Sequence, residues 1–188
     1  MKTLIARAVI LLFVCAAVVK AADIASLGQA TVGTITYQGR KMILKSAYAV
    51  SDAKQSTIAV ELFPFDLSAD DVQKMQKHFV LSVVMSKPSP DPSMWKYAPH
   101  AKIRLRFAKG SSSFTKAGID SYTLFLNGMM EQGRTDSYSI MNPDAATDIS
   151  GFSIDGDELT LVVKRVDTNG GTKGVDYQFQ VKTRLYPQ

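Results

Sequence analysis

The chain has 188 residues, 46% of them hydrophobic, and its 22 Lys and Arg against 17 Asp and Glu give a net charge of +5. Three of the basic residues and no acidic residue fall within the first 21 positions, so the remaining 167 residues carry 19 basic against 17 acidic side chains, a net charge of +2. This nearly neutral balance argues against nucleic acid as a partner, and 167 residues suffice for one hydrophobic core but not for two.

The first 21 residues have the pattern of an export signal. Lys2 and Arg7 precede an unbroken apolar run over residues 8–19, and Ala21 supplies the small residue that a signal peptidase requires. The run is shorter than the ~20 residues of a permanent membrane helix, and every later apolar run is interrupted by charge or alternation. The sequence therefore predicts a cleavable signal peptide over residues 1–21, with cleavage after Ala21 and no transmembrane segment in the mature chain.

The only cysteine, Cys15, lies inside the predicted signal. The residues before it, Leu12-Phe13-Val14, are larger than those that precede a lipid-modified cysteine. The mature chain then has no thiol, which excludes disulfides, thiolate metal sites and cysteine nucleophiles. A basic start, a short apolar core and an exported chain without disulfides are typical of bacteria, so we expect a periplasmic or secreted protein.

Beyond the signal, apolar and polar residues alternate with a period of two, which predicts strands with one buried and one exposed face. The pattern is clearest in the last segment, where Tyr177, Phe179 and Val181 alternate with Gln178 and Gln180. Strands are expected over residues 32–37, 42–50, 58–62, 79–85, 102–107, 122–126, 152–154, 159–166 and 175–185.

Turns and one helix complete the predicted architecture. Gly39, Gly156 and Gly170 lie between alternating segments, where tight hairpins need a positive φ. Ser68 can cap a helix that has acidic residues in its first turn and basic residues in its last, so we expect a short helix over about residues 68–78. The fold class is mainly β: a single domain, residues 22–188, built as an antiparallel β-sandwich or flattened barrel of about nine strands with one short helix.

The stretch GTITYQGRKMILKSAYAV, Gly33 to Val50, resembles the opening of a group of uncharacterised bacterial exported β-rich domains. In that group a Gly-led strand, a glycine turn and a second strand ending in Ala-Tyr-Ala recur. The resemblance covers 18 of the 188 residues. It implies a β-rich architecture and brings no activity or catalytic residues with it.

Motifs for common chemistries are missing from the sequence. It contains no Gly-x-Ser-x-Gly elbow, no phosphate-binding Gly-x-x-x-x-Gly-Lys and no His-Glu-x-x-His helix. The only histidines are His78 and His100, and a Ser-His-Asp hydrolase would have to combine one of them with a serine of residues 111–113. A more economical interpretation makes His78 a cation at a helix C-terminus and His100 the first residue of a strand.

Carboxylates and methionines also have structural explanations. Asp155, Asp157 and Glu158 surround a hairpin glycine without the spacing of a calcium loop, and Asn142, Asp144 and Asp148 lie in a predicted loop. The methionines form no tight repeat that would indicate copper, and methionine commonly fills irregular cores. We therefore expect no metal and no cofactor, while a glycosidase pair drawn from Glu61, Glu131 and Glu158 stays open.

Two segments are candidate binding surfaces. The first is the proline-rich stretch over residues 87–99, where Met94, Trp95 and Tyr97 are grouped on a stiffened loop. Aromatic side chains on such a loop are suited to anchor a partner, although Trp95 could instead plug one end of the sandwich.

The second candidate surface is a basic row formed by Lys102, Arg104 and Arg106, which alternation places on one face of one strand. Lys182 and Arg184 form a similar pair on the last strand, and the two rows would merge if those strands were neighbours. The alternative is an ordinary solvated face whose charges prevent edge pairing.

These features favour a non-catalytic exported binding protein that recognises a protein or a cell-envelope component, of which an inhibitor or immunity-type protein is one form. A small envelope hydrolase with dispersed catalytic residues and a sugar-binding β-sandwich module, with Trp95 and Tyr97 as its platform, are the alternatives. The partner is thus expected to be a protein or a cell-envelope glycan, and the oligomeric state is left open.

Overall fold

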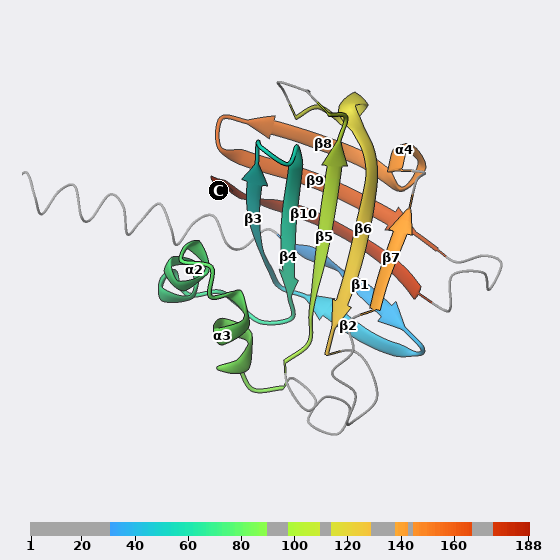
Figure 1. Cartoon of the computed structure of the whole chain (residues 1–188). Coiled ribbons are helices and arrows are strands. Elements are labelled where there is room, and N and C mark those ends of the chain that lie inside the picture. Colours follow the sequence, from blue (N-terminus) through green and yellow to red (C-terminus); the bar gives the residue numbers. More distant parts are fainter. Residues whose placement is uncertain (1–30, 90–97, 110–113, 129–137, 143–144, 167–174) are drawn as a thin grey trace, which may run out of the picture.

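The computed structural model describes residues 31–89, 98–109, 114–128, 138–142, 145–166 and 175–188. The predicted signal peptide lies outside these residues. In the described part, ten strands form one curled, mixed sheet that folds over on itself (Figure 1). The prediction of a mainly β, sandwich-like domain is confirmed.

The elements follow the chain in an order that places most strands beside their sequence neighbours. The strands are β1 (Val32–Tyr37), β2 (Arg40–Leu44), β3 (Ser46–Asp52), β4 (Thr57–Phe63), β5 (His100–Phe107), β6 (Ile119–Asn127), β7 (Tyr138–Asn142), β8 (Ile149–Asp155), β9 (Glu158–Arg165) and β10 (Val175–Pro187). The described helices are α2 (Ala69–Gln76), α3 (Val80–Met85), α4 (Ala145–Asp148) and the 3₁₀ turn η1 (Lys116–Gly118).

The long strand β10 joins two halves of the sheet. Its first part pairs antiparallel with β1 on one side and β9 on the other, and with β2 and β8 these strands form half-sheet A. Its last residues pair in parallel with β3, where Leu185 lies opposite Ala49, and β3 to β7 continue antiparallel as half-sheet B. The two half-sheets therefore enclose a core while staying continuous along one side.

The main core lies between the half-sheets and contains the inward-facing residue of each alternating pair. Ile58, Val60 and Leu62 of β4 are fully buried there, as are Leu161 and Val163 of β9. The alternation read from the sequence thus sorts side chains between core and surface as predicted.

A buried polar network crosses this core. The hydroxyl of Tyr122 on β6 donates to Asp148 of α4 at 2.5 Å and also hydrogen-bonds the hydroxyl of Tyr177 on β10. Arg165 of β9 donates to the same Asp148 oxygen at 3.2 Å. Because these groups come from both half-sheets, the network fixes how the two halves are aligned.

A second, smaller apolar cluster covers part of the outer face of half-sheet B. Tyr48 and Phe63 project outward from β3 and β4 and pack against Met75 of α2 and against Val83 and Val84 of α3. Figure 1 shows both helices beside the β3 and β4 end of the sheet. This explains why β3 and β4 carry Tyr48 and Phe63 on their outer face, since the helices cover that part of it.

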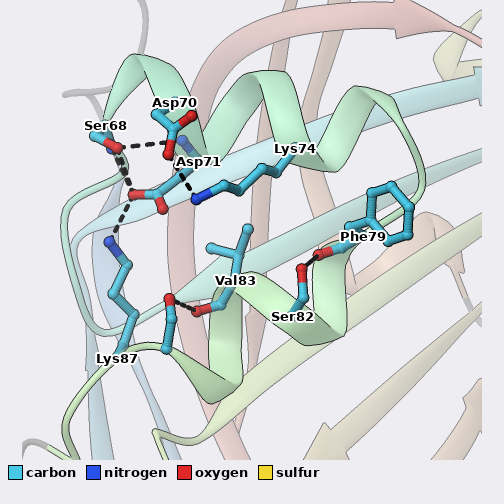
Figure 2. A network of polar contacts seen from close by, with 9 residues as sticks. Ser68, Asp70, Asp71, Lys74, Phe79, Ser82, Val83 and Lys87 are labelled. Carbon is cyan, nitrogen blue, oxygen red and sulfur yellow. Dashed lines mark hydrogen bonds and ion pairs between the residues drawn. The ribbon is translucent and has the colours of Figure 1, made fainter.

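A hydrogen-bond network at the start of α2 connects the two helices (Figure 2). The Ser68 hydroxyl accepts from the Asp71 backbone N–H at 3.2 Å, and the Asp71 carboxylate accepts from the Ser68 backbone N–H at 2.9 Å, forming a capping box. Lys87, which follows α3, donates to the same carboxylate at 2.6 Å. Burial acts to raise the pKa of Asp71, but the hydrogen bonds from Lys87 and Ser68 outweigh it and hold that pKa below its ordinary value.

Three sequence predictions need correction. Residues 79–85 were expected as a strand but form the helix α3, whose Val83 and Val84 are buried in the second cluster. The expected strand over residues 42–50 is two strands that part at Lys45, since β2 belongs to half-sheet A and β3 to half-sheet B. Strand β7 and helix α4 were not predicted.

Candidate functional site

An open groove of about 850 Å³ lies on the outer face of half-sheet B. Strands β3, β4 and β5 form its floor, and the end of α2 and the start of α3 form one wall. The last residues of β10 and of β6, including Tyr186 and Asn127, lie at its ends. The groove is thus assembled from segments that are far apart in the sequence.

Strand register decides which side chains meet on the floor. Lys102 of β5 lies opposite Glu61 of β4, and Arg104 lies opposite Ala59. Both pairs face outward because the residues between them, such as Ile103 and Val60, point into the core. The floor therefore carries the charged pair Glu61 and Lys102 at one position, and Arg104 beside the small side chain of Ala59 at the next outward-facing position.

Glu61 is the most buried acidic side chain of the groove, with 4% of its surface exposed. Its carboxylate forms an ion pair with Lys102 at 2.6 Å. Burial raises the pKa of Glu61, and the positive charges of Lys102 and Arg104 offset only part of that increase. The charge of the Lys102 ammonium is thus paired with a carboxylate of the protein itself, Glu61.

His100 begins β5 at the polar end of the floor. Its Nε2 is 3.1 Å from the amide Nδ2 of Asn127, and its ring stacks on Phe63 with a centroid distance of 6.3 Å. Burial, and then the charge of Lys102, lowers the pKa of His100 to about 4. The imidazole is thus neutral near pH 7, and Nε2 can accept the hydrogen bond from the Asn127 amide.

Arg104 is the exposed cation of the floor. Its guanidinium lies over the ring of Phe125 at 5.5 Å from the centroid, a cation–π contact that restrains the plane of the fork. Within the part of the chain that the structure describes, Arg104 forms no ion pair with a carboxylate. It therefore presents a positive charge to whatever enters the groove.

Aromatic and apolar side chains complete the lining. Tyr48 and Tyr186 stack at a centroid distance of 5.1 Å, and burial, with a smaller effect of Tyr186, raises the pKa of Tyr48 to about 12. The helical wall contributes Met75, Val80 and Leu81. Leu81 is 64% exposed, so a large apolar side chain faces the open groove.

The link between α2 and α3 determines the position of the helical wall of the groove. His78 has a left-handed backbone conformation, φ 66°, and its N–H donates to the Met75 carbonyl at 2.9 Å. This residue lies two positions after Gln76, the last residue of α2, and turns the chain so that α3 begins two residues later. Both histidines of the sequence therefore lie along the same groove, one on the wall and one on the floor.

The structure separates the predicted basic surface into parts with different roles. Lys102 and Arg104 line the groove, whereas Arg106 is exposed on the same face of β5 outside it. Lys182 and Arg184 would join this row only if their strands were neighbours, and this condition is not met. Strands β3 and β4 lie between β10 and β5. The two side chains form ion pairs instead, with Glu158 at 2.9 Å and Asp157 at 2.7 Å.

The aromatic cluster predicted as an anchor or plug, Met94, Trp95 and Tyr97, lies outside the described residues. So do Ser111 to Ser113, proposed as hydrolase nucleophiles, and Asn169 to Gly171, proposed as a turn. Ala98, near the end of the proline-rich stretch, is the first residue described after residue 97, and it is buried in the second cluster with residues of α2 and α3. The choice between anchor and plug for Trp95 stays open.

Sequence reasoning missed Tyr48 and Leu81 as residues of the groove and named Glu61 only as one of three possible glycosidase carboxylates. A weak signal existed for two of them, because the outward-facing positions of β3 and β4 include Tyr48, Val50 and Phe63, which indicates a covered outer face. A Glu placed on such a face needs a partner or a ligand. Leu81 could not be placed, since the helix that carries it was predicted as a strand.

The groove holds no evident metal site. In the described ranges, no group of three or more His, Cys, Asp or Glu side chains is arranged to bind a metal ion. None of the helices described is both long enough and apolar enough to cross a membrane.

Comparison of the chain with protein-family models, with curated proteins and with solved structures finds no match.

Proposed function

We propose that this chain is an exported, non-catalytic binding protein that recognises a protein or a cell-envelope component in the groove on half-sheet B. The location rests on the export signal predicted for residues 1–21. The binding role rests on the groove, whose volume of about 850 Å³ lies in the range of ligand sites.

The observation that carries the proposal is the convergence of unlike side chains on one concave surface. An exposed guanidinium, Arg104, and a neutral imidazole, His100, come from β5, and an exposed apolar side chain, Leu81, comes from α3; all three line the same groove. Apolar walls with a few convergent polar groups are the common composition of binding sites.

The same groove gives less support to the hydrolase alternative. It brings His78, His100 and Glu61 together, but no serine or cysteine is among its described lining residues. Glu61 is engaged by Lys102 at 2.6 Å, and His100 is engaged by Asn127. A general base needs a nucleophile within hydrogen-bond distance, and these side chains have other partners.

Filling the floor of the groove tests the proposal. Ala59 lies between Val50 and Arg104, so Ala59→Phe would place a ring where the ligand is expected. Thr160→Phe introduces the same ring on the outer face of half-sheet A, outside the groove, and serves as the matched control.

Tagged wild-type and variant proteins are used to capture partners from envelope extract and culture fluid of the producing cells, with mass spectrometry and glycan analysis as readouts. We expect the wild type and Thr160→Phe to retain the same component and Ala59→Phe to lose it while keeping its thermal stability. Equal capture by a folded Ala59→Phe variant would place the binding surface elsewhere.

A further inference from the structure

We propose that the groove binds an acidic peptide segment, with a carboxylate of that segment paired to Arg104. This inference rests on the proposed binding function and specifies the chemistry of its ligand. It follows from the distribution of charge and polarity along the groove.

The charges of the groove leave one cation available. Lys102 forms an ion pair with Glu61 at 2.6 Å, so the charges of these two side chains offset each other. Asp52 lies at the end of β3, where its carboxylate accepts the backbone N–H of Gln55 at 3.0 Å. Arg104 is exposed and forms no ion pair with a described carboxylate, so the floor favours an anionic group at this position.

The surroundings of Arg104 favour a carboxylate in particular. The contact with Phe125 restrains the guanidinium plane, and a planar fork matches the two oxygens of a carboxylate. Ala59, directly across on β4, leaves space beside the fork because its side chain ends at Cβ. A ligand can therefore reach Arg104 without displacing a protein side chain.

The remainder of the groove favours a peptide over a simple alkyl acid. At one end, Asn127 and the neutral His100 hydrogen-bond each other, and the remaining oxygen and N–H of the Asn127 amide can bond an amide group of a ligand, while Leu81 and Val80 offer apolar contacts on the wall. A peptide alternates between amide groups and side chains, as this surface alternates between polar and apolar residues. An alkyl chain would leave the carbonyl oxygen and the second N–H of the Asn127 amide without partners, which is costly when they are desolvated.

The test uses three pools of terminally blocked octapeptides that carry a neutral fluorophore and differ only in one central residue: Glu, Gln or Lys. Anisotropy titrations compare the wild type with Arg104→Gln. The control is Arg106→Gln, which removes an exposed charge from the same face of the same strand but outside the groove. Decanoate is included as an alkyl carboxylate.

We expect the wild type and Arg106→Gln to bind the Glu pool about tenfold more tightly than the Gln pool, the effect of a charge-assisted, two-pronged pair. Arg104→Gln should reduce this preference to about twofold or less, and Arg104→Lys should restore part of it. Equal binding of the three pools to the wild type, an equal loss in Arg106→Gln, or binding of decanoate alone would overturn the inference.

Failure of this inference can be told apart from failure of the proposed function. If Ala59→Phe loses its captured partner while the pools bind without discrimination, the groove is a binding site for a different ligand class. If Ala59→Phe captures as the wild type does, the groove is not the binding surface, and the proposed function, which places binding there, is wrong.

Discussion

At the residue scale, two ionisable side chains of the groove respond to pH in opposite directions. Burial raises the pKa of Glu61, so this group stabilises the fold less as pH rises from its ordinary pKa through the raised value. The pKa of His100 is lowered to about 4, so the unfolded chain binds a proton more readily, and stability is lost as pH falls from about 6.5.

We expect His100→Gln to remove the acid sensitivity that His100 causes. With a pKa of about 4 in the folded state and 6.5 as the ordinary value, the wild type should lose about 2 kcal/mol more unfolding free energy than the variant between pH 7 and pH 5. Urea unfolding at both pH values measures the difference.

The exposed histidine provides the control for this experiment. His78→Gln makes the same substitution at the histidine whose side chain is exposed on the groove wall, and its stability is measured at the same two pH values. If His100→Gln and the wild type lost stability equally on acidification, the buried, neutral state of His100 would be wrong.

At the element scale, the helix pair depends on the cap at Ser68. The Ser68 hydroxyl accepts the backbone N–H of Asp71, and Asp71 in turn holds Lys87 beyond α3 (Figure 2). The position of the groove wall therefore depends on a short hydrogen-bond network as well as on the apolar contacts of Met75 and Val83.

Ser68→Ala should lower the unfolding free energy by about 1 kcal/mol, the usual effect of losing an N-cap side chain. Ser82→Ala is the matched control: its hydroxyl bonds only the Phe79 carbonyl on an exposed turn of α3, so we expect a change within about 0.5 kcal/mol. Denaturant unfolding of both variants decides the point. Equal effects would show that the cap network contributes nothing beyond a surface hydrogen bond.

The elements also show which parts of the fold can be predicted from sequence. Strands such as β5 and β10 alternate over six or more residues, and their period identified both the strand and its buried face. Residues 79–85 are a short apolar run, which periodicity cannot distinguish between helix and strand. The segment is helical because it packs Val83 and Val84 on the second cluster and satisfies its own backbone groups.

The candidate site could be predicted only in part for a related reason. Alternation within β5 placed Lys102 and Arg104 on one face, which the structure confirms. The pairing of Lys102 with Glu61 depends on the register between β4 and β5, separated in sequence by both helices. No local pattern contains that register, so the groove and its one available cation emerge only in three dimensions.

At the scale of the whole molecule, the two half-sheets differ in what their outer faces carry. The polar network of Tyr122, Asp148, Tyr177 and Arg165 aligns them inside the core, and β10 keeps them continuous on one side. In half-sheet A, Lys182 of β10 forms an ion pair with Glu158, the first residue of β9. Arg184 forms one with Asp157, the residue before it. Half-sheet B carries α2, α3 and the groove. A framework of this kind can hold a binding surface without disulfides, since packing and buried hydrogen bonds supply the rigidity.

The central claim, that a partner occupies the groove, predicts a sharp difference between two positions on α3. Leu81 and Met85 are similarly exposed, at 64% and 61%, but only Leu81 lines the groove. A photo-cross-linking amino acid is placed at either position in the protein as produced by its own cells.

Irradiation should yield a discrete adduct from position 81 and none from position 85. Adducts from both positions, or from position 85 alone, would contradict the account.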